Sequence, residues 1–442
     1  MKKVIETLRN IWKIEDLRER ILFTLGIILI YRIGSFVVLP GVDSEALAEA
    51  NSGGGRGLAG LIDLFVGGAF SRASIFALGI MPYISASIIM QLMGIAVPAI
   101  QKMQREGESG RKKMNQWTRV LTILITTLQA PGYVASQIPG NAHPEGTMWW
   151  VTTILILVTG TVFVMWLGEK ITDKGIGNGI SMLIMIGIIA RLPFAFAQEV
   201  VGRLGGAGGM VMLLVEVVLL LLMILATIML VQGTRKIPVQ FAKRVVGNKQ
   251  YGGVRQYIPL KVNSAGVMPI IFAQAIMMVP MYITQMTGAQ GGIFVALSNF
   301  QGFWYNFVFA ILIILFTYFY TALTVNSNQI ADDMKKNGGF IPGVKPGRKT
   351  SEFIDTLLSR ITLPGSIFLA IIAIMPAFAA QFGVKQQFSM FFGGTSLLIM
   401  VGVVLDTLQQ IESHLLMRQY DGLMKSGKIK GRGGGGATFG MS

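Results

Sequence analysis

The residue types that usually carry chemistry are scarce and scattered in this sequence of 442 residues. It contains no cysteine, and its two histidines, His143 and His414, lie far apart. Disulfides, thiolate metal sites and cysteine nucleophiles are therefore excluded, and a histidine metal site is not expected. The nucleotide-binding pattern GxxxxGK[ST] and the protease patterns HExxH and GxSxG do not occur. We expect neither an enzyme nor a bound cofactor or metal.

Three ionisable residues, Arg32, Glu216 and Asp406, lie inside long apolar runs. Ion-coupled carriers need such groups at depth, because charge is costly to move through hydrocarbon. We expect these three to be structural, paired or interfacial, and we keep a secondary transporter with a five-plus-five inverted repeat as the alternative function. The glycines of GIGNGIS (175–181) follow a charged turn rather than a strand, so we expect a loop that enters a helix.

The elements around these residues are apolar helices. Hydrophobic residues make up 52% of the chain and charged residues 14%, against about 25% charged in average soluble proteins. Membrane helices of about 20 residues account for such runs. We expect ten spans, at 21–39, 75–98, 118–137, 149–168, 180–201, 210–231, 262–286, 303–325, 361–382 and 393–413.

The basic residues indicate how these spans are oriented. With these boundaries, 32 of the 38 Lys and Arg residues lie on one side and 5 on the other. By the positive-inside rule, both termini face the cytoplasm. The start, MKKVIETLRNIWKIEDLRER, is charged and lacks a cleavable signal, so the first span must act as its own insertion signal.

Ten spans divide into two fives at GRLGGAGGM (202–210). Five is odd, so two similar halves would be inverted repeats, with a pathway expected near their interface. This parity is the only evidence for the repeat, and ten helices without internal symmetry stay possible. We divide the chain into an N-terminal half (1–201), a C-terminal half (202–431) and a disordered glycine-rich tail (432–442).

One segment breaks the apolar pattern: LFVGGAFSRASIFALGIMPYISASII (64–89). Gly67 and Gly68 each cost about 1 kcal/mol relative to alanine in a helix, and Arg72 would cost about 2.5–3.5 kcal/mol at the bilayer centre. We therefore expect a short helix near 61–66, a turn at 67–74 and a span from about 75 that Pro82 kinks. Polar backbone freed at the break must be buried in protein or line an aqueous cavity.

Five long stretches carry a resemblance to a known family. They are GGAFSRASIFALGIMPYISASIIMQL (67–92), REGESGRKK (105–113), VTGTVFVMWLGEKITDKGIGNGIS (158–181), PLKVNSAGVMP (259–269) and FFGGTSLLIMVGVVLD (391–406). In this order they resemble the SecY family, whose members form the pore of the protein-conducting channel. The resemblance implies an all-α membrane protein, with ten transmembrane helices in two inverted five-helix halves around an hourglass pore and a short plug half-helix.

The resemblance also assigns roles to residues of this chain. A pore ring would consist of Ile80, Ile84, Ile180, Ile184, Ile271 and Ile399. A plug near 61–74 would include Leu61, Leu64, Phe65, Gly67, Gly68, Phe70 and Arg72. A lateral gate would open between the second and third spans and the seventh and eighth, with Gln129 and Asn263 as candidate polar contacts; simple helix–helix contact is the alternative for these two.

Two long basic loops, 232–261 and 332–360, would form a docking platform for a SecA-type ATPase and the ribosome. Its candidate residues are Arg244, Arg255, Lys345 and Arg348. Lys345 stands where the family generally has an arginine, and lysine keeps the charge without the planar fork. The resemblance further implies SecE-like and SecG-like small membrane subunits, signal peptides and unfolded client polypeptides as partners. The excess of basic residues makes anionic lipid a further expected partner. We expect the bacterial cytoplasmic (inner) membrane as the location.

Overall fold

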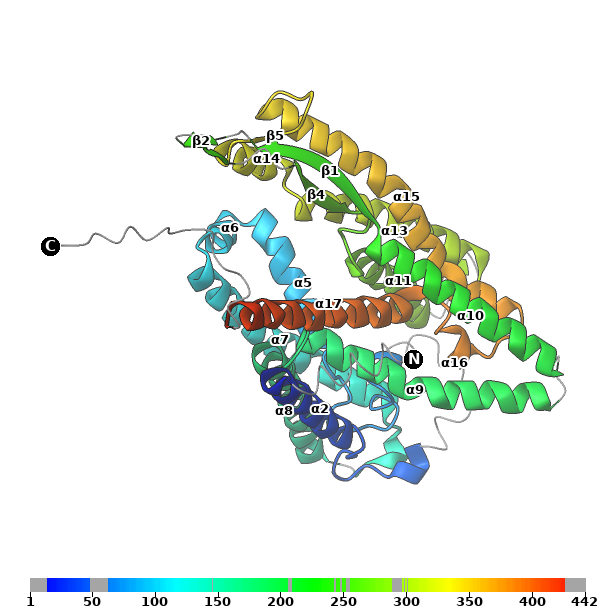
Figure 1. Ribbon diagram of the computed structural model, residues 1–442. Coiled ribbons are helices and arrows are strands. Elements are labelled where there is room, and N and C mark those ends of the chain that lie inside the picture. Colours follow the sequence, from blue (N-terminus) through cyan, green and yellow to red (C-terminus); the bar gives the residue numbers. More distant parts are fainter. Residues whose placement is uncertain are drawn as a thin grey trace.

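The structure, a computed structural model, is mostly helical (Figure 1). It describes residues 14–47, 63–144, 146–205, 209–241, 244–246, 249–251, 255–287, 296–297, 299 and 301–425. Leu61 and the tail 432–442 lie outside these ranges, so the expectations for them stay predictions.

A helix overlaps each of the ten expected spans. These helices are α2 (Glu15–Gly34), α5 (Met81–Ala96), α7 (Glu108–Gln137), α8 (Thr147–Lys174), α9 (Gly179–Leu204), α10 (Gly209–Gln232), α11 (Met268–Thr287), α13 (Phe303–Thr324), α15 (Arg348–Gln381) and α17 (Gly394–Lys425). Shorter helices are α6 (Pro98–Arg105), η1 (Gly140–Ala142), α14 (Ser327–Lys336) and α16 (Gln386–Ser389). Among the described residues, six helical stretches are long and apolar enough to cross a membrane: Thr147–Lys174, Gly179–Leu204, Gly209–Gln232, Phe303–Lys336, Arg348–Gln381 and Gly394–Leu416.

The second span differs from its prediction. Residues 66–80 form successive turns, and α5 begins only at Met81, not near 75. Pro82 therefore lies in the first turn of α5, where its missing N–H has no helical partner to lose. It starts the helix instead of kinking it.

The loop expected at GIGNGIS is confirmed. Gly177 has a φ of +82°, which favours glycine, and its N–H donates to Oε1 of Gln410 on α17 (2.9 Å). Asn178 then caps α9, since its side-chain oxygen accepts from the N–H groups of Ile180 and Ser181.

The helices form two groups with α17 between them. In Figure 1, α2, α7, α8 and α9 lie in the lower group and α10, α11, α13 and α15 in the upper one. Helix α17 contacts α9 from the first group and α10, α11 and α15 from the second. One buried core lies mainly in the first group, but Phe388, Phe391 and Phe392, which precede α17, pack into it. The two groups are therefore joined through the last third of the sequence.

A buried ionic cluster ties the ends of α9 and α10 together. Arg203 donates to Glu199 (3.0 Å), to Glu216 and to the carbonyl oxygen of Gly383 (2.9 Å). The Lys385 backbone N–H donates to the second carboxylate oxygen of Glu199 (2.9 Å). Glu216 is 1% exposed and ion-paired, which agrees with the structural role expected for it.

The expectation of an all-helical chain is wrong in the basic loops. Strand β1 (Thr234–Phe241) lies between β4 (Arg255–Lys261) and β5 (Gly339–Phe340) in a three-stranded antiparallel sheet, and β2 (Arg244–Val246) pairs with β3 (Lys249–Tyr251). Ile237 and Val239 are buried, whereas Lys236 and Pro238 are exposed, as in a sheet with one buried face. This alternation is visible in the sequence, but the segment was interpreted as a loop because it is basic.

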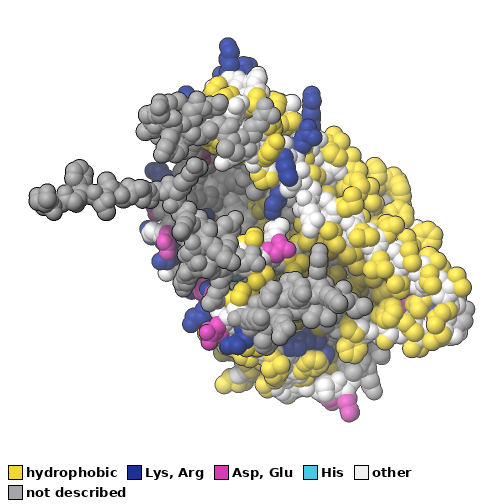
Figure 2. Space-filling view, viewed as in Figure 1, with side chains coloured by type: hydrophobic (Ala, Val, Ile, Leu, Met, Phe, Trp, Pro, Cys, Tyr) yellow, Lys and Arg dark blue, Asp and Glu magenta, His cyan; other side chains and the backbone are white. Residues whose placement is uncertain are grey.

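Apolar and basic side chains separate on the surface. Figure 2 shows hydrophobic side chains covering the side that α10 and α15 form in Figure 1. Many large apolar side chains on α10 are more than half exposed, among them Leu214, Leu221, Leu225 and Met229. Such a surface is suited to hydrocarbon rather than to water.

Candidate functional site

The broken segment lies inside the first helix group. Asp63, Leu64 and Phe65 form a short helical stretch, and the turns that follow run to Ile80. The chain from Val66 to Phe70 is buried throughout. The half-helix predicted near 61–66 is thus present over the part that the structure describes, but the turns extend beyond the expected residue 74.

Hydrogen bonds to neighbouring chain segments satisfy backbone groups in the later part of this segment. The N–H of Leu39 donates to the carbonyl oxygen of Ala73 (2.8 Å), and the N–H of Ile75 donates to that of Val37 (2.9 Å). The Tyr133 hydroxyl on α7 donates to the carbonyl oxygen of Phe70 (2.8 Å). Polar backbone exposed by the break is therefore bonded within the protein.

Three arginines converge on the first turns of the segment. Arg32 on α2 and Arg72 both donate to the carbonyl oxygen of Gly67, at 3.0 and 3.1 Å. Both guanidinium groups also lie over the ring of Phe36, with centroid distances of 5.1 and 4.2 Å. Arg191 on α9 forms an ion pair with Asp63. Arg72, whose charge made a continuous helix implausible, thus donates a hydrogen bond to the backbone at the break.

Asp63 also accepts hydrogen bonds from the backbone of the turn. Its Oδ1 accepts from the N–H of Ser71 (2.9 Å), and its carbonyl oxygen accepts from the N–H of Gly68 (2.9 Å). The Asp63 side chain is 4% exposed and that of Arg191 25%. A buried carboxylate without such partners would be strongly destabilising, so the pair with Arg191 fixes where the segment meets α9.

Glycines allow this close approach. A Cβ on Gly187 of α9 would lie 2.2 Å from the carbonyl oxygen of Phe65, which no side chain tolerates. Gly67 has a φ of +67°, and a Cβ there would lie 2.7 Å from Nη1 of Arg32. The segment and α9 therefore pack backbone to backbone, which explains the glycine pair at 67 and 68.

Five of the six predicted ring isoleucines share one hydrophobic cluster with this segment. Ile80, Ile184 and Leu64 are buried in it, and Ile84, Ile180, Ile399 and Phe65 pack against it. Ile399 comes from α17, so the cluster includes residues of both halves. Ile271 on α11 is half-buried and belongs to no cluster, although its neighbour Ile270 lies in the core of the second helix group.

Among the described residues, no hydrogen bond joins the two gate candidates, and their gate role stays a prediction. Gln129 is exposed on α7, and Asn263 lies in the turn before α11, with a buried Oδ1 that has no hydrogen-bond partner. A different polar contact joins the helices in question. The Tyr320 hydroxyl on α13 donates to Oε1 of Gln91 on α5 (2.6 Å), beside stacked rings of Phe272 and Phe316. Sequence reasoning missed this pair, although Gln91 is a lone amide within an apolar helix.

The two basic loops form one unit. In the sheet, Gln240 and Phe241 of the first loop pair with Phe340 and Gly339 of the second. Beneath it, a core combines Ile237, Val239 and Leu260 with Met334, Ile341, Ile354 and Leu358. We name this unit, residues 234–261 and 327–360, the basic platform.

The platform presents basic residues at its surface. Lys345 and Arg348 are exposed, and the Lys345 carbonyl accepts from the Thr350 hydroxyl (3.0 Å). A hydrogen bond with Glu352 raises the pKa of Lys349 and lowers the pKa of Glu352. Arg244 and Arg255 begin β2 and β4, but their side chains lie outside the description. Among the described residues, no group of three His, Asp or Glu side chains could hold a metal ion.

A family model described as SecY matches residues 74–408. The chain is also 44% identical over 437 residues to a Protein translocase subunit SecY of Streptomyces scabiei, covering 94% of this chain and 98% of that one. This chain belongs to the SecY family. Residues 74–408 contain α5 to α16, with the platform, and about the first half of α17, so the match extends across both helix groups.

Two solved channel structures share the fold of this SecY family member. One, described as "The structure of a protein conducting channel", has a TM-score of 0.63 at 17% identity, with 92% of this chain and 94% of the other covered. The other is Sec61 in a canine ribosome-channel complex, with a TM-score of 0.60 at 16% identity and the same coverage. The chain is a multi-pass membrane protein.

We predict that the Asp63–Arg191 ion pair holds the broken segment in place. Asp63→Asn keeps the side-chain volume but removes the charge opposite Arg191, which should cost about 1.5–3 kcal/mol. Amide hydrogen exchange at residues 67–74 should then become roughly 10- to 100-fold faster. Asp43→Asn, which neutralises an exposed carboxylate before the segment, is the control. Equal exchange in the two variants would show that the pair does not hold the segment.

Proposed function

We propose that this chain is the pore subunit of a protein translocation channel. It moves unfolded secretory polypeptides across the bacterial cytoplasmic membrane and releases membrane-protein segments sideways into the bilayer. The observation that carries this proposal is that Ile80, Ile84, Ile180, Ile184 and Ile399 belong to the same hydrophobic cluster as Leu64 and Phe65. Side chains from both halves and from the broken segment thus share one apolar core.

An isoleucine ring suits this task physically. It offers no hydrogen bonds to a passing chain, so no client sequence is retained by polar contacts. A narrow apolar constriction also excludes water and so blocks ions. In the resting state, the segment near 61–74 would act as the plug, held by Arg32 of α2 and Arg191 of α9.

The proposed architecture is ten transmembrane helices in two inverted halves, α2 to α9 and α10 to α17, around an hourglass pore. Ile271 would complete the ring when α11 turns or shifts toward the cluster. The buried pairing of Glu216 with Arg203 leaves this carboxylate engaged within the protein. That engagement, together with family membership, favours a channel subunit over a secondary transporter or an enzyme.

The lateral gate would open between α5 and α7 on one side and α11 and α13 on the other. The Tyr320–Gln91 hydrogen bond closes this seam and must break when the gate opens. A segment in the pore would then partition between water and lipid. Each Leu, Ile, Phe or Val gains about 0.3–0.6 kcal/mol in lipid, whereas one central Lys, Arg or Asp costs about 2.5–3.5 kcal/mol.

Both termini and the basic platform would face the cytoplasm, as the distribution of Lys and Arg predicts. The platform would dock a SecA-type ATPase and the ribosome, whose RNA phosphates suit exposed Lys345 and Arg348. SecE-like and SecG-like subunits would cover the helix bundle. Signal peptides and unfolded clients would enter through the pore, and anionic lipid would surround the basic side.

The isoleucine ring can be tested by ion flux. Replacing Ile80, Ile184 and Ile399 with serine should raise the resting ion conductance of reconstituted vesicles at least tenfold, because a polar constriction stays wet. The matched control replaces Ile311, Ile367 and Ile371, which are exposed on the outer surface of α13 and α15. Conductance that stays at the control level in correctly folded protein would refute the ring.

The platform can be tested by charge reversal. Lys345→Glu with Arg348→Glu should weaken ribosome co-sedimentation. If both residues contact phosphates, the slope of the logarithm of the binding constant against the logarithm of the salt concentration should fall in magnitude by about 2. The control is Lys112→Glu with Lys113→Glu, two exposed lysines at the start of α7 that give the same change in net charge. Unchanged binding of both the ribosome and a SecA-type ATPase at physiological salt would exclude these two residues from docking.

A further inference from the structure

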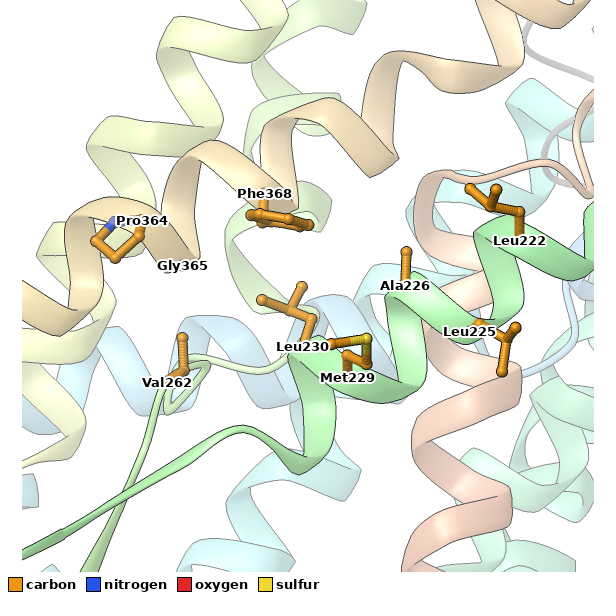
Figure 3. A pocket seen from close by; sticks show the side chains of 9 residues that line it. All are labelled: Leu222, Leu225, Ala226, Met229, Leu230, Val262, Pro364, Gly365 and Phe368. Carbon is orange, nitrogen blue, oxygen red and sulfur yellow. The ribbon is translucent and has the colours of Figure 1, made fainter. Parts of the chain in front are cut away.

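Two features of the structure are left unexplained by the proposed channel: an apolar crevice and an excess of positive charge at the broken segment. Figure 3 shows the crevice, which has a volume of about 480 Å³ and lies between α10 and α15. Its lining is entirely apolar, from Leu222 on α10 to Phe368 on α15. Such a lining has no group that selects one ligand over another, whereas the charges at the broken segment do.

Three guanidinium groups and one carboxylate meet at the first turns of the broken segment. The carboxylate of Asp63 is ion-paired with Arg191. Arg32 and Arg72 take part in no ion pair among the described residues. Their common acceptor is the carbonyl oxygen of Gly67, which is neutral. Within the described part of the chain, two positive charges are therefore not balanced by a negative one.

The guanidinium groups are close enough to repel one another. Nη1 of Arg32 and Nη2 of Arg72 lie 3.0 and 3.1 Å from the same oxygen, so these nitrogens are no more than about 6 Å apart. A Cβ on Gly68 would lie 2.9 Å from Nη2 of Arg72 and 3.1 Å from Nε of Arg191, which sets a similar limit for that pair. All three arginines are half-buried, so water screens their repulsion less than at an open surface.

Most N–H donors of Arg32 and Arg72 also lack an acceptor within the described residues. A guanidinium group carries five such donors. Arg32 donates to Gly67 and, at 3.4 Å, to Oγ of Ser35, whereas Arg72 donates to Gly67 alone. Nε of Arg72 is buried and has no hydrogen-bond partner there. Donors without an acceptor, on charges without a counterion, indicate an anionic ligand.

We propose that a small inorganic anion, such as chloride, binds between Arg32 and Arg72 and stabilises the docked position of the broken segment. Two donors no more than about 6 Å apart can both reach one ion that lies about 3 Å from each. The ring of Phe36 lies against both guanidinium groups and is 55% exposed, so an ion can approach from that side. One arginine belongs to α2 and the other to the segment, so the site exists only while the segment is docked. A ligand of the docked form shifts the equilibrium toward that form.

The inference does not depend on polypeptide transport. It needs only the docked segment, and it is tested on the full-length protein without a client or a motor. A protein that transports clients but shows no anion effect would count against the site alone. An anion effect in a protein that transports nothing would support the site and count against the proposed function alone.

Chloride binding can be measured directly by the line width of the chloride NMR signal, since a bound ion relaxes faster than a free one. Full-length protein should broaden the signal, and Arg72→Gln should remove at least half of this broadening. The control is Arg18→Gln, which removes a cation from α2 about 21 Å along the helix from Arg32. The same broadening in all three proteins would show that chloride does not bind at the segment.

Binding should also slow opening of the segment itself. At a constant ionic strength of about 0.15 M, replacing chloride with the bulky anion gluconate should speed amide hydrogen exchange at residues 64–72. A tenfold change corresponds to a chloride concentration about ten times the dissociation constant. Arg72→Gln should make exchange independent of the anion, whereas Arg18→Gln should keep the dependence.

Two exchange results would contradict the site: equal rates in both anions for the unsubstituted protein, or a chloride dependence that survives Arg72→Gln. Glu49 lies outside the described residues and is the alternative source of a negative charge near this segment in the sequence. With a free anion bound, Glu49→Gln should leave the chloride dependence unchanged. A dependence that appears only in Glu49→Gln would overturn the proposal, because the carboxylate of the chain would then occupy the site.

Discussion

The structure depends on how a broken helix is accommodated inside a bundle of apolar helices. Where regular structure stops, the backbone N–H and C=O groups find no water in hydrocarbon and must be bonded within the protein. Here the Gly67 carbonyl accepts from Arg32 and Arg72, and the Asp63 side chain accepts from Ser71. Residues 37–39 pair with residues 73–75. The break is therefore an ordered part of the fold, and several helices must surround it to supply these hydrogen bonds.

Close packing of the surrounding helices follows from that requirement. Gly187 and Gly160 have no side chains where the segment crosses α9 and α8, since a Cβ at either would lie within 2.3 Å of a backbone oxygen of Phe65 or Ile75. The segment consequently sits deep enough for Leu64 to join isoleucines from α5, α9 and α17. The same fold leaves α10 and α15 facing outward, where their apolar surface and the basic platform meet.

Local patterns in the sequence were sufficient to predict the elements, but not their contacts. Gly67, Gly68 and Arg72 correctly predicted a break, because their costs in a helix are local properties. The start of α5 was misplaced, because the turns at 75–80 are as apolar as the helix that follows. The strands of the platform were missed although Ile237 and Val239 alternate with exposed neighbours. The Asp63–Arg191 and Gln91–Tyr320 contacts join residues more than a hundred positions apart, and no periodicity reports on them.

The central claim is that an unfolded polypeptide passes through the isoleucine cluster. The most direct measurement is photo-crosslinking to a client chain stalled in transit, with a photoreactive residue placed at Ile184, at Ile399 or at the outward-facing Ile311. Our account predicts crosslinks to the client from positions 184 and 399 and none from 311. Crosslinks from 311 alone, or none from either cluster position with a client demonstrably in transit, would contradict it.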